Sequence, residues 1–313
     1  MSVVEGLHHV TAISGGAQAN VDFYVGVLGL RFIKRTVNFD DPGTYHLYYG
    51  DGEASPGTVM TFFPWANAPK GTQGSGQLTV TAFSVPKGSL DYWRARLTKN
   101  DVEYGEVEDR FGDKVLPFAD ESGMKLELIA SDDPREAWNG GTVPVESAMR
   151  GFHSTTLSLQ NSARTAEILG LLGFREAVTG EGRTRYEAGT GGPGNSVDLV
   201  DGSGGPEGRM GVGTVHHVAF RVANDEVHGE VREEVAKLGF DVTPVLDRNY
   251  FHSIYFREPG GVLFEIATDN PGFDADEPLD ELGESLKLPA WLEPRRERIE
   301  QTLDPLTVPG GER

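Results

Sequence analysis

Apolar and polar positions along the chain follow one plan four times: an alternating strand, an amphipathic helix, a turn and three further strands. The four copies, here called modules one to four, occupy residues 1–63, 76–130, 151–201 and 214–268. A helix followed by three antiparallel strands is typical of an α+β fold. Because such a half-open sheet cannot cover its own concave face, the modules are expected to pair into two barrel-like domains.

Each predicted helix carries apolar residues at a spacing of about 3.6 residues, which indicates one buried face. The predicted inward stripes of the first and fourth helices are Val21, Tyr24, Val25 and Leu28, and Val227, Val231, Val235 and Leu238. Ser89 and Ser162 are the predicted N-caps of the second and third helices. His228 lies among glutamates in the fourth helix, and we expect it to face the solvent.

Two segments rich in glycine, proline and charge, 64–75 and 131–149, are typical of linkers. The tail, 270–313, begins with acidic residues and then offers 291–303 as a candidate helix. Packing of this tail over a domain is the simpler interpretation, since no feature of the sequence supports a lid.

Composition limits the possible partners. Cysteine is absent from the 313 residues, which excludes disulfides and thiolate metal sites and leaves His, Asp and Glu as ligands. The net charge of -20 argues against nucleic acid or an anionic membrane as a partner. No signal-like segment precedes the first strand, and no apolar stretch approaches membrane-spanning length. We therefore expect a cytoplasmic protein that acts on a small molecule.

A His-His phrase occurs twice at the head of a predicted strand, as His8-His9 in module one and His216-His217 in module four. The second copy is followed by a strand with one carboxylate, Glu265, in an otherwise apolar run. A buried carboxylate is costly to ionise without a cation or a donor beside it. Two imidazoles and one carboxylate on strands can form a facial metal site with open coordination positions. A single strand histidine, by contrast, is more often a hydrogen-bonded core residue.

Because side chains alternate faces along a strand, superposing the module starts tests which histidines can meet. His9 and His217 hold the same inward place in modules one and four. His153 of module three falls in the place of His8, so it is out of register and is expected to be structural. Module one should therefore pair with module four, which leaves module two with module three.

The last strands extend this comparison. Modules four, two, one and three place Glu265, Glu127, Thr61 and Asp198 at equivalent positions. Glu127 and Asp198 have no histidine companions, so the pair of modules two and three is expected to bind no metal. The pair of modules one and four combines three strong ligands, His9, His217 and Glu265, with Thr61. Such a site leaves room for a bidentate substrate and dioxygen, as in non-haem iron(II) oxygenases.

Six short motifs are spread along nearly the whole chain. They are Leu7-His-His-Val-Thr, Lys34-Arg-Thr-Val-Asn, Tyr45-His-Leu-Tyr-Tyr, Pro56-Gly-Thr-Val-Met-Thr, Arg150-Gly-Phe-His-Ser, and Asp247-Arg with Tyr255 and Pro259-Gly-Gly. Together they resemble the vicinal-oxygen-chelate superfamily of glyoxalases, bleomycin-resistance proteins and extradiol dioxygenases, and more narrowly its hydroquinone-cleaving ring dioxygenases. The resemblance implies four βαβββ modules in two barrel-like domains, with metal ligands at His9, His217 and Glu265.

The resemblance also implies roles for residues around the metal. Tyr255 lies ten positions before Glu265, where dioxygenases of the superfamily place a tyrosine that hydrogen-bonds a substrate oxygen. Arg248 matches a pocket arginine that could steady a phenolate or superoxide by charge-assisted hydrogen bonds. The alternative for Arg248 is a surface ion pair with Asp247. Thr11 has the inward parity of the ligands and could touch the substrate.

Four other histidines each have more than one interpretation. His8 and His216 match positions beside the ligands in the family, but strand parity puts their side chains on the opposite face of the sheet. They could orient the ligands or donate protons, or they could be packing residues. His46 sits among tyrosines and could belong to the core or to a pocket wall, and His252 has no supporting neighbours.

These features predict an iron(II)-dependent ring-cleaving dioxygenase that inserts O2 into a hydroquinone or a related dihydroxy-aromatic, with manganese(II) as a possible alternative ion. Leu246 and Arg248 stand about where a catechol-cleaving enzyme would carry an acid–base histidine. That favours para-diols and leaves the proton shuttle unassigned. A glyoxalase-type lyase or isomerase would need a second glutamate in place of Thr61, and a binding or resistance protein would not need a complete triad. We expect the enzyme to be a homo-oligomer.

Overall fold

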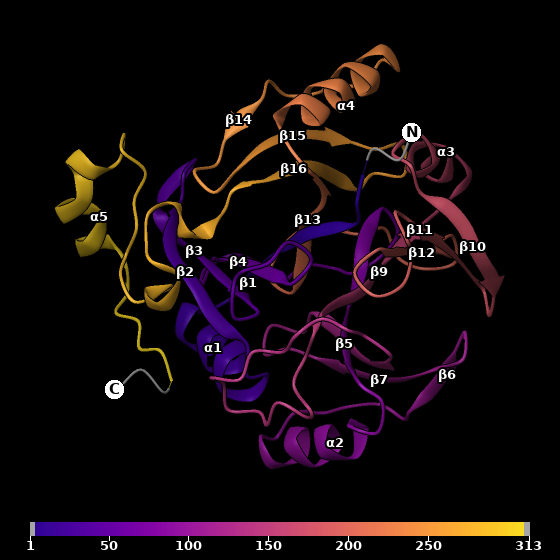
Figure 1. Ribbon diagram of the computed structural model, residues 1–313, viewed down its shortest axis with the longest axis horizontal. Coiled ribbons are helices and arrows are strands. Elements are labelled where there is room, and N and C mark those ends of the chain that lie inside the picture. Colours follow the sequence, from indigo (N-terminus) through magenta and orange to yellow (C-terminus); the bar gives the residue numbers. More distant parts are fainter. Residues whose placement is uncertain (1–3, 310–313) are drawn as a thin grey trace.

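The computed structural model describes residues 4–309 and contains two curled, eight-stranded sheets with helices at the periphery (Figure 1). The first sheet has the order β14-β15-β16-β13-β1-β4-β3-β2, and the second has the order β10-β11-β12-β9-β5-β8-β7-β6. The strands of the first sheet are β14 (Leu246–Asp247), β15 (Phe251–Arg257), β16 (Leu263–Pro271), β13 (Thr214–Val222), β1 (Leu7–Ser14), β4 (Val59–Pro64), β3 (Asp41–Gly50) and β2 (Arg31–Asn38). The strands of the second are β10 (Arg175–Gly180), β11 (Arg183–Glu187), β12 (Ser196–Asp201), β9 (Gly151–Leu159), β5 (Gln77–Pro86), β8 (Lys125–Ser131), β7 (Asp113–Ala119) and β6 (Glu108–Arg110).

Each sheet joins the modules that the strand parity predicted. β1 of module one pairs with β13 of module four in antiparallel register, and β5 of module two pairs with β9 of module three in the same way. The predicted α+β fold, with modules one and four in one sheet and modules two and three in the other, is therefore confirmed. The module boundaries that we assigned from the sequence remain our proposal for how the chain divides.

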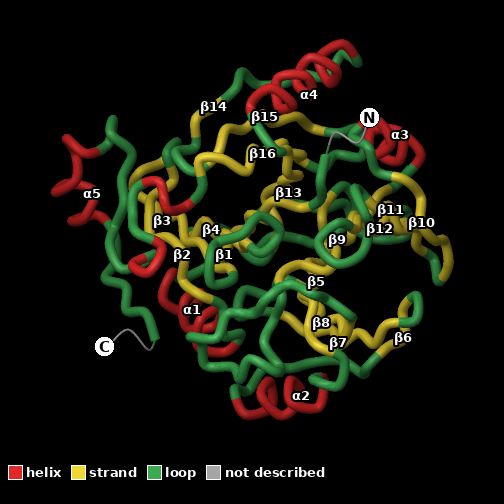
Figure 2. Tube along the Cα trace, in the orientation of Figure 1, coloured by secondary structure: helices red, strands yellow, loops and turns green. Residues whose placement is uncertain are grey.

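The helices differ from the expectation in detail. The first is short, since α1 (Ala17–Val21) continues as a π-helical segment η1 (Asp22–Val27). The others are α2 (Leu90–Lys99), α3 (Ala163–Leu171) and α4 (Asp225–Lys237), and Figure 2 shows them at the outside of the sheets. Ser89 and Ser162 occupy the N-cap positions, but neither side chain bonds to a helix N–H. The fourth helix is capped instead by Asn224, whose side chain accepts from the N–H of Val227.

Two expectations for the fourth helix were wrong. His228 is 1% exposed and not solvated, because it faces the sheet and its Nε2 donates to the carbonyl of Ile266. Leu238 is 48% exposed and not inward, because α4 has its last residue at Lys237. A polar side chain in a helix can be buried when a backbone carbonyl of the neighbouring strand accepts its proton.

The tail covers the outer strand of the first sheet (Figure 1). It contains three single turns, η2 (Phe273–Ala275), η3 (Leu279–Glu281) and η4 (Glu293–Arg295), and the helix α5 (Arg296–Thr302). Lys34 of β2 is completely buried and binds Asp276 and Glu277, both at 2.8 Å. Because a buried ammonium needs a partner, this ion pair ties the tail to the sheet.

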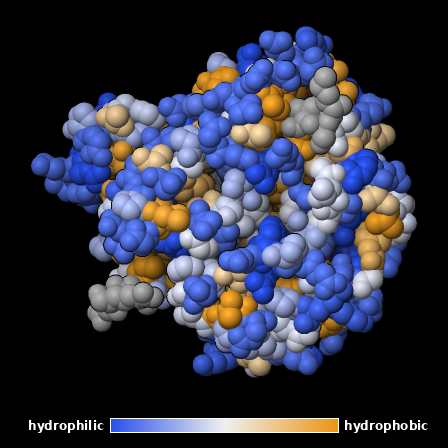
Figure 3. Space-filling view, viewed as in Figure 1, coloured by the Kyte–Doolittle hydropathy of each residue, from blue (hydrophilic) through white to orange (hydrophobic). Residues whose placement is uncertain are grey.

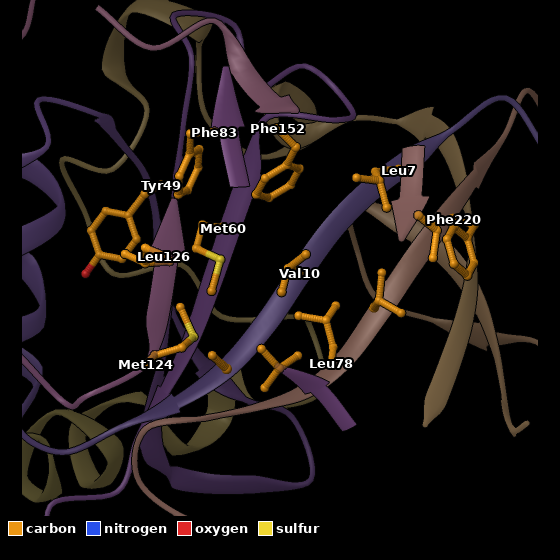
Figure 4. Packing of buried hydrophobic residues seen from close by; sticks show 14 of the residues in the cluster. Leu7, Val10, Tyr49, Met60, Leu78, Phe83, Met124, Leu126, Phe152 and Phe220 are labelled. Atoms are coloured by element: carbon orange, nitrogen blue, oxygen red, sulfur yellow. The ribbon is translucent and has the colours of Figure 1, made fainter. Parts of the chain in front are cut away.

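The main hydrophobic core lies between the two sheets. Figure 4 shows Val10 and Met60 of the first sheet near Phe83, Leu126 and Phe152 of the second. From Val10 onward the even positions of β1 enter this shared core, so the odd positions of this part of the strand point toward the concave side of the first sheet. The shared core therefore sets which side chains face the concave side.

The outer surface is mainly hydrophilic, with small separate apolar patches on the face drawn in Figure 3. Within residues 4–309, none of the helices has both the length and the apolar character needed to cross a membrane.

A buried carboxyl group at the domain interface predicts a pH-dependent stability. Asp120 follows β7, is 6% exposed, and accepts a hydrogen bond from the hydroxyl of Tyr24 at 3.1 Å. Burial, followed by repulsion from Glu121, raises the pKa of Asp120 to about 7. A raised carboxyl pKa costs no stability below the unfolded-state value; the cost grows as the pH rises from there to the folded-state pKa and is constant above it.

We therefore expect Asp120→Asn to be more stable than the wild type at pH 8. The gain in unfolding free energy should be about 2 kcal/mol larger at pH 8 than at pH 5. Urea denaturation at both pH values measures the difference. Asp91→Asn is a matched control because the Asp91 side chain is 98% exposed. An equal gain in unfolding free energy at the two pH values would contradict the raised pKa of Asp120.

Candidate metal centre

Three side chains from the two ends of the chain converge on the concave side of the first sheet. His9 comes from β1, His217 from its neighbour β13, and Glu265 from β16 on the far side of β13. The Nε2 of His217 lies 2.9 Å from Oε2 of Glu265, and the Nε2 of His9 lies 3.3 Å from the same oxygen and 3.3 Å from the Nε2 of His217. Within residues 4–309, these three form the one group of three or more potential ligands that could share a metal ion.

The donor atoms fit a divalent cation. Two ligand atoms at a right angle, each about 2.1 Å from a metal, lie about 3.0 Å apart, close to the separations found here. Oε2 of Glu265 is buried and has no hydrogen-bond donor, whereas Oε1 accepts a short hydrogen bond from the hydroxyl of Ser253. A buried carboxylate oxygen without a donor is costly, and a bound cation would remove that cost.

The strand positions of His8 and His216 explain how the ligands are oriented. The register of β1 against β13 shifts between Leu7 and His9 and again between Thr11 and Ala12, so that His8 and His216 are the extra residues of two β-bulges. A bulge re-aims the side chain of the extra residue. The parity expectation that His8 and His216 point away from the ligands is therefore wrong.

Each bulge histidine contacts the ring of the ligand that follows it. Nδ1 of His8 lies 2.9 Å from Nδ1 of His9, and Nδ1 of His216 lies 2.8 Å from Nδ1 of His217. When the ligand ring keeps its proton on Nδ1 and donates it to the bulge histidine, its Nε2 lone pair is free for a metal. The series of hydrogen bonds that starts at His9 ends on a backbone group, since Nε2 of His8 donates to the carbonyl of Thr268 at 3.2 Å.

Burial favours the neutral form of three imidazoles around the centre, those of His8, His216 and His217. Burial, with a smaller effect of the neighbouring ligand, lowers the pKa of His8 and of His216 to about 3. Burial also lowers the pKa of His217. For Glu265 burial acts in the opposite direction, but attraction to His9 and His217 outweighs it and holds the pKa of the carboxyl well below its usual range. Neutral imidazoles and an ionised carboxylate are the forms that bind metals.

A cavity of about 360 Å³ opens beside the triad, here called the aromatic cavity. Its lining includes the aromatic side chains Phe39, His46, Tyr48, Phe63, Trp65, Phe251 and Tyr255. The rings of Phe63 and Trp65 stack at 17° with their centroids 5.6 Å apart. Flat, mostly apolar walls with a few polar groups suit a planar ring.

Tyr255 and Arg248 lie together in the wall of the aromatic cavity. Nε of Arg248 donates to the Tyr255 hydroxyl at 3.3 Å, and the Tyr255 ring packs edge-on against His217. Burial, followed by the negative charge of Glu265, raises the pKa of Tyr255 above its usual value, so the phenol keeps its proton. Arg248 pairs at 3.4 Å with Asp40, and not with Asp247 as the surface alternative proposed.

Thr11 is fully buried behind the wall and does not line the aromatic cavity. Its hydroxyl is joined to Thr61, Thr61 to Nε2 of His46, and Nδ1 of His46 to the Tyr48 hydroxyl, each by a hydrogen bond of 2.8 Å. His46 is therefore a wall residue held in place by its neighbours, and the Thr61 hydroxyl is engaged with Thr11 and His46.

In the second sheet, arginine side chains bind the carboxylates that are equivalent to the candidate ligand Glu265. Glu127 of β8 is bound by both terminal nitrogens of Arg110, and Asp198 of β12 by Arg185 at 2.7 Å. His153 lies in this second sheet, where its Nδ1 is 3.1 Å from Oγ of Ser154. The two inward carboxylates of modules two and three are thus neutralised by guanidinium groups.

Comparison with known proteins agrees with this geometry. The family model of the "Glyoxalase/Bleomycin resistance protein/Dioxygenase superfamily" matches residues 6–128 and 163–266, which include parts of all four modules. The chain belongs to this superfamily. Each matched segment contains one module of the first sheet and one of the second, so both the arginine-filled sheet and the candidate metal sheet are built from modules of this superfamily.

Within the superfamily, the chain is similar to named dioxygenases along almost its whole length. It is 48% identical over 305 residues to the "Putative ring-cleaving dioxygenase MhqO" of Bacillus subtilis (strain 168), covering 97% of each chain. It is 38% identical over 318 residues to the "Chlorohydroquinone/hydroquinone 1,2-dioxygenase" of Sphingobium indicum, covering 97% of this chain and 98% of the relative. A solved Bacillus subtilis structure, described as a "putative dioxygenase", superposes with a TM-score of 0.94 at 46% identity, covering 97% of this chain and 98% of its own.

Sequence reasoning missed three residues of the site. Ser253 bonds the candidate ligand Glu265, Asp40 pairs with Arg248, and Phe251 packs its ring on both His8 and His9. Ser253 could have been found, since it precedes Tyr255 by two residues and therefore shares its face of β15. No comparable signal marks Asp40, because it lies at a hairpin turn.

Proposed function

We propose that this protein is a ring-cleaving dioxygenase that holds iron(II) at His9, His217 and Glu265 and inserts O2 into a hydroquinone or a related aromatic diol. The observation that carries the proposal is the convergence of three metal-binding atoms at the edge of an aromatic-lined cavity. Two nitrogens and one carboxylate leave coordination positions open, as in non-haem iron oxygenases. The named activities of the relatives support the same reaction class.

In this proposal the protein binds and orients the diol. An iron(II) ion in the site would supply the electron transfer between the aromatic ring and dioxygen. The stacked Phe63 and Trp65 side chains hold the plane of the substrate, and the aromatic walls exclude water. Arg248 stabilises a phenolate by charge, while the protonated hydroxyl of Tyr255 donates a hydrogen bond to a substrate oxygen.

The cavity favours a para-diol over a catechol. Leu246 and Arg248 both line it at the place where an acid–base histidine would be expected for catechol cleavage. Among the histidines that line the cavity, His46 is neither a candidate ligand nor hydrogen-bonded to one, and its two ring nitrogens are hydrogen-bonded to Thr61 and Tyr48. Burial also lowers the pKa of His46 well below its usual range, so it is a poor proton carrier.

The decisive experiment is anaerobic reconstitution with ferrous ion, followed by oxygen uptake with a panel of hydroquinones and catechols. We expect uptake with one O2 per diol, and faster turnover of hydroquinones than of catechols. Turnover without oxygen uptake, supported by zinc or nickel, would indicate a lyase or isomerase of the glyoxalase type. No turnover of any diol by the iron-loaded protein would refute the proposal. The cytoplasmic location and the homo-oligomer remain predictions.

Tyr255→Phe tests the substrate hydrogen bond. Removing one hydroxyl that donates to a charged oxygen should lower kcat/KM for hydroquinone by about 10- to 100-fold. The iron content should not change, because Tyr255 is not one of the candidate ligands. Tyr45→Phe is the control, since the Tyr45 hydroxyl donates to the carbonyl of Asp304 in the tail. An unchanged kcat/KM in Tyr255→Phe would remove this residue from the mechanism.

A further inference from the structure

A second and larger cavity, of about 560 Å³, lies between the glycine-rich segment that precedes β13 and the turn that joins β15 to β16. We call it the polar cavity. Its lining includes Gln77 at the start of β5, Gln160 and Asn161 after β9, and Arg257 at the end of β15. No role in the proposed reaction has been assigned to it so far.

The two cavities share a wall. His216, His217 and Leu263 line both of them, so the candidate ligand His217 stands between the aromatic cavity and the polar cavity. The side chains of His216 and Leu263 are partly exposed, whereas His217 is 5% exposed. The separation between the two spaces is therefore one side chain thick.

The polar cavity presents hydrogen-bond donors. Several side-chain donors in the lining have no protein acceptor among residues 4–309. They are the side-chain amide nitrogens of Gln77, Gln160 and Asn161, Nε2 of His216, and Nε and Nη2 of Arg257. Arg257 uses only one terminal nitrogen, which donates to the carbonyl of Gly261 at 2.6 Å. One carboxylate, that of Glu207, lies in the same lining. A wall with this excess of donors suits a ligand rich in acceptor oxygens.

We propose that the polar cavity binds the ring-opened product, and this inference rests on the proposed function. Cleavage breaks the bond between a hydroxylated carbon and its neighbour and leaves one oxygen atom of O2 on each of these carbons. The ring supplies the four electrons that reduce O2, so no other reductant is needed. A cyclic diol thus becomes an open chain with a carboxylate and an aldehyde.

The two cavities match these two molecules. The aromatic cavity has stacked walls suited to a planar ring, whereas an acyclic carboxylate gains more from Arg257 and the free amides across the wall. The product forms beside His217, one side chain away from those donors. Movement of the His216 and Leu263 side chains would then let the product leave by a route other than the one by which the diol enters.

The binding step is tested on metal-free protein, so that the test does not depend on turnover. The probe is cis,cis-muconate, a stable six-carbon dicarboxylate, titrated calorimetrically. We expect Arg257→Gln to weaken binding by about tenfold or more, the size of one charge-assisted hydrogen bond. Arg248→Gln, which changes the aromatic cavity alone, should leave muconate binding unchanged. Loss of binding in Arg248→Gln but not in Arg257→Gln would overturn the proposal.

The release step is tested with iron-loaded protein. Met210→Trp adds bulk in the lining of the polar cavity, and Leu171→Trp adds the same bulk at an exposed site on α3. Met210→Trp should lower steady-state turnover about three- to tenfold, leave the single-turnover rate unchanged, and produce a burst of product. Equal turnover in both variants, without a burst, would refute a role in product release. If the wild type turns over no diol, the proposed function fails, and the calorimetric result still stands.

Discussion

Glu265→Gln is expected to lose bound metal and, with it, turnover. The amide keeps the size of the side chain and can still pair with the Ser253 hydroxyl, but it removes the negative charge shared by His9 and His217. Loss of a hydrogen bond that only supports a metal ligand already costs about 10- to 100-fold in metal affinity, and loss of an anionic ligand should cost more. We therefore expect a decrease of more than about 100-fold in affinity for ferrous ion.

Metal analysis after anaerobic reconstitution measures this decrease. A second measurement is the melting temperature, because an ion that binds only the folded protein raises it. The wild type should become more stable on addition of ferrous ion, and Glu265→Gln should not. Glu127→Gln, at the equivalent place in the second sheet, should keep the full metal content. Stoichiometric iron in Glu265→Gln would show that the ion lies elsewhere.

Arg110→Met is expected to destabilise the second domain by about 3 to 5 kcal/mol, because it leaves the carboxylate of Glu127 buried without its partner. Glu127 and Arg110 are each 6% exposed, and both terminal guanidinium nitrogens bind the carboxylate. The negative charge would have to be buried alone or neutralised by a proton. Denaturation in urea, followed by circular dichroism, measures the change.

The double variant Arg110→Met, Glu127→Leu separates charge from packing. Replacement of a complete buried ion pair by apolar residues of similar volume is often neutral or stabilising. We therefore expect the double variant to recover most of the lost stability. A double variant as unstable as Arg110→Met alone would mean that the arginine stem, and not its charge, holds the sheet together.

Equivalent positions in the two sheets thus require a positive charge for the same physical reason. Glu265 and Glu127 both pair across β-ladders with an alanine of a central strand, Ala219 and Ala82. In the first sheet the charge would be a metal ion held by two histidines, and in the second it is a guanidinium. Modules of one plan therefore give one sheet a candidate reaction centre and the other a structural ion pair.

Superposition of the modules, together with strand periodicity, was sufficient to choose the candidate triad. A period of two assigns His9, His217 and Glu265 to one face as long as each strand keeps its register. The same rule failed at His8 and His216 because a bulge inserts one residue and re-aims the side chain, and nothing in the residue types marks a bulge there.

Helix ends and side-chain partners were less predictable. The burial of His228 depends on the carbonyl of Ile266, which lies 38 positions along the chain, and no local pattern reveals that acceptor. The contact of Lys34 with Glu277 spans 243 positions. Long-range hydrogen bonds of this kind come from the packing of modules, whereas the fold itself follows from repeated local patterns.

The order of the strands has a consequence for synthesis of the chain. Modules two and three are continuous in sequence, so their sheet can close while the polypeptide is still on the ribosome. β1 emerges first but must wait for β13, its partner in the first sheet. Domains generally fold as units during translation, and pairing between distant segments is slow. The nascent protein therefore carries His9 on a strand that has β4 but not yet β13 beside it. The candidate metal centre is complete only after Glu265 on β16 has left the exit tunnel, so it is among the last parts to assemble.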